Sequence, residues 1–78
     1  VNTVPLYIRK IITLAATYNA AEAIIAHNHP SGNPLPSRQD IEVTRKIVEG
    51  GRLLGIELAD HIIIGDKKYF SFKEQEML

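Results

Sequence analysis

The strongest constraint on the fold is a loop rich in proline and glycine near the middle of the chain, residues 29–37. It contains Pro30, Gly32, Pro34 and Pro36. Proline lacks a backbone N–H and glycine weakens regular elements, so neither a helix nor a strand can run through this segment. The apolar residues on its two sides must therefore belong to separate elements that the loop connects.

The residues before this loop predict a helix followed by a buried strand. Apolar residues recur at spacings of mostly three and four over residues 5–18, which is typical of an amphipathic helix, and Thr3 is its expected cap. Residues 22–26 form a short, nearly continuous apolar run, which favours a strand buried on both faces. The helix is thus expected to end near Asn19, and the strand to begin at residue 22.

The residues after the loop predict a second helix and two further strands. Ser37 is a good N-cap, apolar residues then recur at helical spacing, and Gly55 is a suitable stop. Strands are expected over residues 57–64 and 68–72, with a turn between them. The order helix, strand, helix, strand, strand predicts a layered α/β unit.

The composition excludes several classes of protein. Nine basic residues balance nine acidic ones among the 78, and there is no cysteine. A neutral chain is not expected to bind nucleic acid, and a chain without cysteine has neither disulfides nor thiolate zinc sites. The sequence shows no pattern of a leader peptide and no apolar stretch of about 18 residues, so neither secretion nor a membrane span is expected. We therefore expect one cytoplasmic domain, residues 1–78, away from membranes; its oligomeric state remains open.

Two histidines at the end of the first predicted strand form a candidate metal site. His27 and His29 are two positions apart, so their side chains leave the same face of a strand and can converge on one ion. Asp40 lies one turn into the second predicted helix, and the loop can return its carboxylate to the histidine pair. Two imidazoles and one carboxylate suit zinc and leave one coordination position open for water, as in catalytic zinc sites.

Ser37 precedes Asp40 by three residues and has two compatible interpretations. Its hydroxyl is placed to stabilise a substrate oxygen or a tetrahedral intermediate by a hydrogen bond. The pair Ser37 and Asp40 also has the spacing of a helix capping box, which needs no metal. Capping fixes the start of the helix from which Asp40 must reach the ion, so both roles can coexist.

The spacing of these residues resembles the JAMM motif of a metalloprotease superfamily, His-x-His, seven residues, Ser, two residues, Asp. The chain matches it without insertion or deletion, and residues 27–32, His-Asn-His-Pro-Ser-Gly, are similar to its RadC branch. Further similarity is found at residues 53–56, Leu-Leu-Gly-Ile, and at residues 60–66, Asp-His-Ile-Ile-Ile-Gly-Asp. The chain thus resembles a RadC-like JAB domain from about residue 20 onward.

This resemblance implies a fold, a cofactor and an activity. The fold would be an α/β sandwich of the cytidine-deaminase-like (JAB/MPN) type, and the metal would be zinc. Relatives in the superfamily are peptidases or isopeptidases, so the resemblance implies a hydrolase that acts on a protein or peptide. The alternative is a non-catalytic accessory protein linked to DNA repair or recombination.

One departure from the superfamily concerns the catalytic acid and base. Its members use a glutamate on an early strand to transfer protons, and that residue would precede the first helix of this chain. Glu22 is the only glutamate ahead of His27, and five residues of strand separate the two by about 16 Å. The resemblance therefore implies that the domain is truncated at its N-terminus and that this chain is catalytically incomplete.

His61 has two interpretations that the sequence leaves open. It can support the metal site from a neighbouring strand through a hydrogen bond to a ligand. Its alternation with Ala59 and Ile63 favours the simpler interpretation, in which it is a half-buried residue of the strand.

Overall fold

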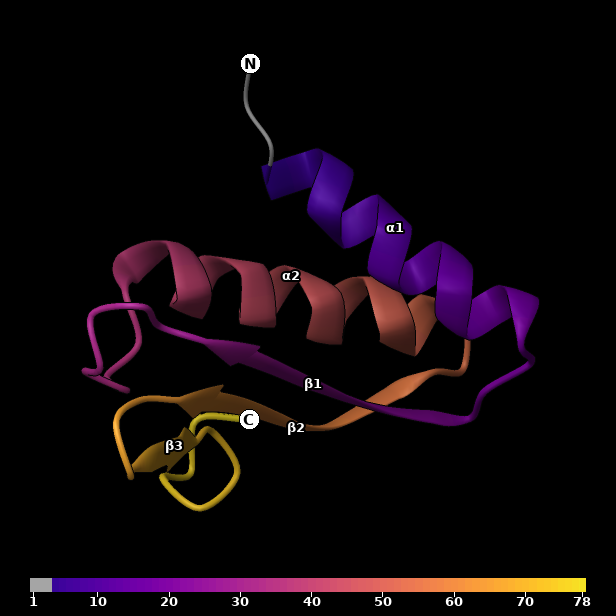
Figure 1. Cartoon of the computed structure of the whole chain (residues 1–78). Helices are drawn as coiled ribbons and strands as arrows, with labels where there is room; N and C mark the ends of the chain where they lie inside the picture. Colours follow the sequence, from indigo (N-terminus) through magenta and orange to yellow (C-terminus); the bar gives the residue numbers. More distant parts are fainter. Residues whose placement is uncertain (1–3) are drawn as a thin grey trace.

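The computed structural model describes residues 4–78 and has the predicted order of elements (Figure 1). The elements are α1 (Val4–Thr17), β1 (Glu22–Asn28), α2 (Arg38–Leu53), β2 (Glu57–Ile64) and β3 (Tyr69–Ser71). Compared with the prediction, β1 extends two residues further and β3 is shorter. The expected cap Thr3 lies outside the described residues. The connecting loop takes up the residues between β1 and α2, as its prolines require.

The strands form one mixed sheet with the order β1-β2-β3. β1 and β2 are parallel and are connected through α2, whereas β2 and β3 are antiparallel neighbours. Figure 1 shows both helices on the same side of this sheet, with α2 next to the strands and α1 across α2. The expected α/β architecture is thus present as a three-stranded sheet with two helices. Within residues 4–78, no helix is both long and apolar enough to cross a membrane.

The core lies between α2 and the two parallel strands. Ile25 of β1, Leu58 of β2, and Val43 and Ile47 of α2 form its buried cluster. Ile8 and Ile11 of α1 also pack against this cluster. The core therefore fixes α2 over the sheet and directs the first turn of α2 toward the ends of β1 and β2.

A β-bulge interrupts the pairing of β1 with β2. Ala23 pairs with Leu58 and Ile24 pairs with Asp60, so Ala59 has no counterpart on β1. An extra residue in one strand reverses the alternation of side chains beyond it. Leu58 and His61, three positions apart, are consequently both buried. The bulge is what turns the His61 side chain toward the interior.

Asp60 connects β2 to the C-terminal segment through three hydrogen bonds. Its Oδ1 accepts from the backbone N–H of His61 at 2.7 Å and from that of Lys73 at 3.0 Å, and its Oδ2 accepts from the Ser71 hydroxyl at 2.6 Å. Burial raises the pKa of this carboxyl, but the hydrogen bonds and the charge of Lys73 outweigh burial and hold the pKa below its usual value. Asp60 is therefore expected to remain ionised in mildly acidic solution.

Asp60→Asn is expected to lower the free energy of unfolding at neutral pH by about 1 to 2 kcal/mol, because charge-assisted hydrogen bonds are lost. A folded-state pKa below the unfolded value of 3.8 means that the carboxylate stabilises the fold above that pH. This contribution disappears as the pH falls through the folded-state pKa. Urea unfolding of both proteins across the acid range should therefore show a difference at neutral pH that shrinks on acidification. A difference independent of pH would contradict this assignment.

Candidate metal centre

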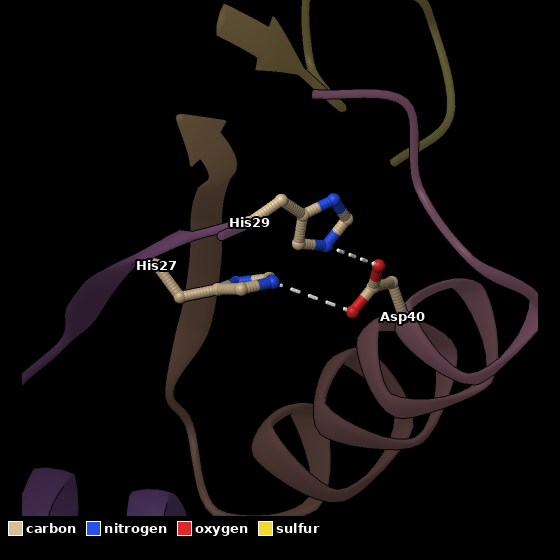
Figure 2. Close-up of side chains that lie close together, drawn as sticks. All are labelled: His27, His29 and Asp40. Atoms are coloured by element: carbon tan, nitrogen blue, oxygen red, sulfur yellow. Dashed lines mark hydrogen bonds and ion pairs between the residues drawn. The ribbon is translucent and has the colours of Figure 1, made fainter. Parts of the chain in front are cut away.

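The two histidines of the predicted site extend from the end of β1 toward the first turn of α2 (Figure 2). His27 lies within β1, one residue before its end. His29 lies just beyond β1 but still follows the strand, because its backbone N–H donates to the carbonyl of Ile64 at 2.9 Å. Both side chains are partly buried. The extended backbone thus places two imidazoles on the same side, as the spacing predicted.

Asp40 reaches the histidine pair from the first turn of α2. Ser37 is the N-cap: its hydroxyl accepts from the Asp40 N–H at 3.0 Å, while its own N–H donates to Asp40 Oδ2 at 2.8 Å. The predicted capping box is confirmed. Because the carboxylate is held by this reciprocal bond, its direction is fixed by the helix start and does not depend on a flexible rotamer.

The three side chains offer a compact set of metal ligands. One nitrogen from each histidine and one carboxylate oxygen of Asp40 all lie within 4.8 Å of one another. His29 Nε2 is 3.0 Å from Asp40 Oδ2, and His27 Nε2 is 3.4 Å from Asp40 Oδ1. His27, His29 and Asp40 can therefore hold a metal ion.

The hydrogen bonding of His29 leaves the nitrogen that faces Asp40 free to bind a cation. Its Nδ1 lies 2.9 Å from the backbone carbonyl oxygen of Asn33, which only accepts, so Nδ1 carries the hydrogen. In a neutral ring Nε2 then has a lone pair, and this lone pair faces the Asp40 carboxylate. Two acceptor atoms this close are stabilised by a positive charge shared between them, either a proton or a metal ion.

The electrostatics of Asp40 suit a ligand that must be ionised. Burial raises the pKa of the carboxyl, but hydrogen bonding with Ser37 and the positive charges that His27 and His29 can carry outweigh it. The net pKa lies below the usual value for aspartate. The carboxylate is therefore available to a cation without first losing a proton.

His61 belongs to this site, so the simpler interpretation of it as a half-buried strand residue is wrong. The residue is 2% exposed, and its Nε2 lies 3.0 Å from His27 Nδ1. Its ring stacks on Phe72 with centroids 4.9 Å apart. Burial, together with the positive charge that His27 can carry, lowers the pKa of His61 to about 4, so the ring is neutral at physiological pH.

The turn after β2 packs closely against the turn that follows His29. The backbone N–H of Asp66 donates to the carbonyl of Gly32 at 2.8 Å, and the N–H of Gly32 donates to the carbonyl of His29 at 2.9 Å. Gly65 lies directly against this turn, and a Cβ atom there would overlap the Gly32 carbonyl oxygen. The absence of a side chain at Gly65 therefore lets the turn after β2 pack against the turn that follows His29.

Glu22 stands at the opposite end of β1 from the histidines. It lines a cavity together with Arg52 of α2 and Lys73 and Leu78 of the C-terminal segment. Glu22 therefore lies at the start of β1, away from the histidines at its end, as its place in the sequence predicts.

Comparison with known proteins identifies relatives over almost the whole chain. Residues 1–77 match the family described as the RadC-like JAB domain. A UPF0758 protein of Bacillus licheniformis is 57% identical over 70 residues, and the UPF0758 protein YsxA of Bacillus subtilis is 56% identical over 70 residues, each covering 90% of this chain. A UPF0758 protein of Methanosarcina mazei is 55% identical over 67 residues, or 86% of the chain. These matches span only 29% to 31% of the relatives' own lengths.

Proposed function

Because the chain belongs to the family of RadC-like JAB domains, we propose that it is the metal-binding part of a zinc-dependent hydrolase of peptide or isopeptide bonds. His27, His29 and Asp40 would be the zinc ligands. Since the chain spans less than a third of the relatives' length, this activity is proposed for the protein that contains the domain.

One observation carries the proposal: a nitrogen from each histidine and an oxygen of Asp40 converge within 4.8 Å. The other ring nitrogens have hydrogen-bond partners in Asn33 and His61, which is how protein metal sites orient their imidazoles. These supporting hydrogen bonds distinguish the site from clusters of exposed acidic residues, which are common in proteins without a bound metal.

The donor set favours zinc among the common metals. Two imidazoles and a single carboxylate match catalytic zinc sites, whereas calcium and magnesium prefer sites made of oxygen ligands alone. When bound by three protein ligands, zinc supplies an open position at which the pKa of a water falls to about 7, which makes a nucleophile available at neutral pH.

Ser37 would assist the reaction by donating a hydrogen bond. Its oxygen already accepts from the Asp40 N–H, and among residues 4–78 its own hydrogen has no acceptor. The hydroxyl can therefore donate to the carbonyl oxygen of a scissile bond and stabilise the negative charge that develops there. The capping bond fixes the position of the oxygen while leaving its hydrogen available.

A second candidate function is a metal-binding accessory module without hydrolysis of its own, linked to DNA repair or recombination. The position of Glu22 at the far end of β1 favours it, because a glutamate there cannot move a proton at the histidines during hydrolysis. The neutral net charge favours a protein or peptide partner over nucleic acid in either case.

Zinc titration of the metal-free chain tests the site directly. Binding to the native state alone should raise the free energy of unfolding by about 2.7 kcal/mol at a hundredfold excess over Kd, and His29→Ala should abolish this rise. Asn28→Ala is the matched control, because Asn28 is exposed and lies between the two histidines.

Hydrolysis of a fluorogenic isopeptide-linked lysine substrate then separates the two candidate functions. Cleavage by the complete protein that depends on zinc and on His29 would support the hydrolase. Zinc binding without cleavage would favour the accessory module, and failure of the parent chain to bind zinc would overturn the proposed site.

A further inference from the structure

We propose that Thr44 and His61 are positioning residues that fix the hydrogen of His27 on Nδ1, so that its Nε2 presents a lone pair to the metal. This inference rests on the proposed function, since it concerns how the site is prepared for zinc. Neither residue would touch the ion.

Thr44, His61 and His27 form a series of hydrogen bonds, and a backbone carbonyl at one end determines which atom donates in each of them. The Thr44 hydroxyl donates to the carbonyl oxygen of Asp40, one helical turn earlier, at 2.7 Å. A carbonyl oxygen has no hydrogen to give, and threonine in a helix commonly bonds in this way. The single hydrogen of the Thr44 hydroxyl is thereby committed to Asp40.

The remaining bonds follow from that first one. With its hydrogen committed, Thr44 Oγ1 must accept at its 2.6 Å contact with His61 Nδ1, so the His61 hydrogen is on Nδ1. A neutral His61 then has a lone pair on Nε2, and this atom accepts from His27 Nδ1 at 3.0 Å. His27 consequently has its hydrogen on Nδ1 and a lone pair on Nε2, the atom that faces Asp40 Oδ1.

Burial keeps water from replacing these bonds. Thr44 and His61 are each 2% exposed, and His61 lies against Phe72, which is 1% exposed. In such surroundings a polar atom without a partner destabilises the fold, so the chain of bonds keeps one direction. This series of hydrogen bonds begins at the backbone carbonyl of Asp40 and ends at His27, whose Nε2 faces the Asp40 carboxylate. The tautomer of His27 thus depends on the same residue that supplies the third proposed ligand.

Thr44→Val tests the inference with almost no change in side-chain shape. The variant leaves His61 Nδ1 without an acceptor, which favours the tautomer that donates from Nε2 to His27. The His27 hydrogen then moves to Nε2, where it opposes metal binding. Zinc affinity, measured by calorimetric titration, should fall roughly 10- to 100-fold, and Thr44→Ser, which keeps the hydroxyl, should bind zinc like the parent. Parent-like affinity in folded Thr44→Val would overturn the inference.

Nitrogen-15 NMR of the metal-free parent provides a second test that needs no variant. At about pH 8, where an ordinary imidazole is neutral, the inference requires His27 and His61 to be protonated at Nδ1 and unprotonated at Nε2. The opposite tautomers would overturn the inference even if zinc binds. The expected tautomers in a protein that binds no zinc would instead leave the positioning intact and overturn the proposed function.

Discussion

Asp40→Ala is expected to abolish zinc binding and also to destabilise the metal-free chain. The first effect removes about 2.7 kcal/mol of zinc-dependent stabilisation at a hundredfold excess over Kd. The second arises because the Ser37 N–H loses its acceptor, bonded at 2.8 Å, and the first turn of α2 loses its negative charge. Loss of this hydrogen bond is expected to cost about 1 kcal/mol. Chemical denaturation with and without zinc measures both effects.

Asp40→Asn separates the two roles of this side chain. Asparagine keeps an oxygen that can accept from the Ser37 N–H, so most of the metal-free stability should return, but it removes the charge that a zinc ligand supplies. Zinc-dependent stabilisation should therefore remain weak. If Asp40→Asn gained as much stability from zinc as the parent, Asp40 would serve only as the capping-box partner of Ser37, without a role in metal binding.

Gly65→Ala is expected to cost about 1 to 3 kcal/mol of unfolding free energy, because overpacking forces the backbone to move. The added methyl group would overlap the Gly32 carbonyl oxygen and would lie 2.9 Å from Pro34 Cδ. Gly32 is bonded to the His29 carbonyl, so the displacement reaches a metal ligand. Zinc affinity should consequently fall roughly 10-fold or more, as for other residues that orient ligands. Thermal unfolding and zinc titration measure the two losses.

Gly55→Ala is the matched control for this substitution. Gly55 has φ near 70°, so alanine is strained there by about 1 kcal/mol, but a Cβ atom meets nothing within 4 Å. The residue follows the C-terminal end of α2, whereas Asp40 lies in its first turn. A loss of stability without a loss of zinc affinity is expected. Equal losses of affinity in both glycine variants would mean that global destabilisation, and not the displaced turn, weakens the site.

The sequence predicts much of the fold because its local signals agree with one another. The prolines of residues 29–37 exclude regular structure, Ser37 marks the start of α2, and β2 has the bounds that its apolar run predicts. The convergence of His27, His29 and Asp40 is also readable from the sequence, since it depends on strand alternation and on a capping box close by in the chain. Local rules are sufficient wherever the neighbours in space are also neighbours in sequence.

The role of His61 is harder to predict because it depends on contacts that are distant in the chain. Simple alternation along β2 fails at Ala59, where the extra residue reverses which face is buried. No proline or glycine marks this bulge. The closeness of Gly65 to Gly32 depends in the same way on two turns that meet only in the folded chain. The burial of His61 and the contact between Gly65 and Gly32 can therefore be found only from the three-dimensional structure.

The use of one carboxylate for capping and for metal binding has a kinetic consequence. In the proposed site Asp40 cannot swing away from an ion without also releasing the Ser37 N–H and exposing the first turn of α2. Movement of this ligand away from the ion would thus be coupled to opening of the capping box at the helix end. Helix ends open and close on a scale of about a microsecond or less. A carboxylate that detached would therefore return to its place on that timescale, and we expect a bound metal to exchange slowly.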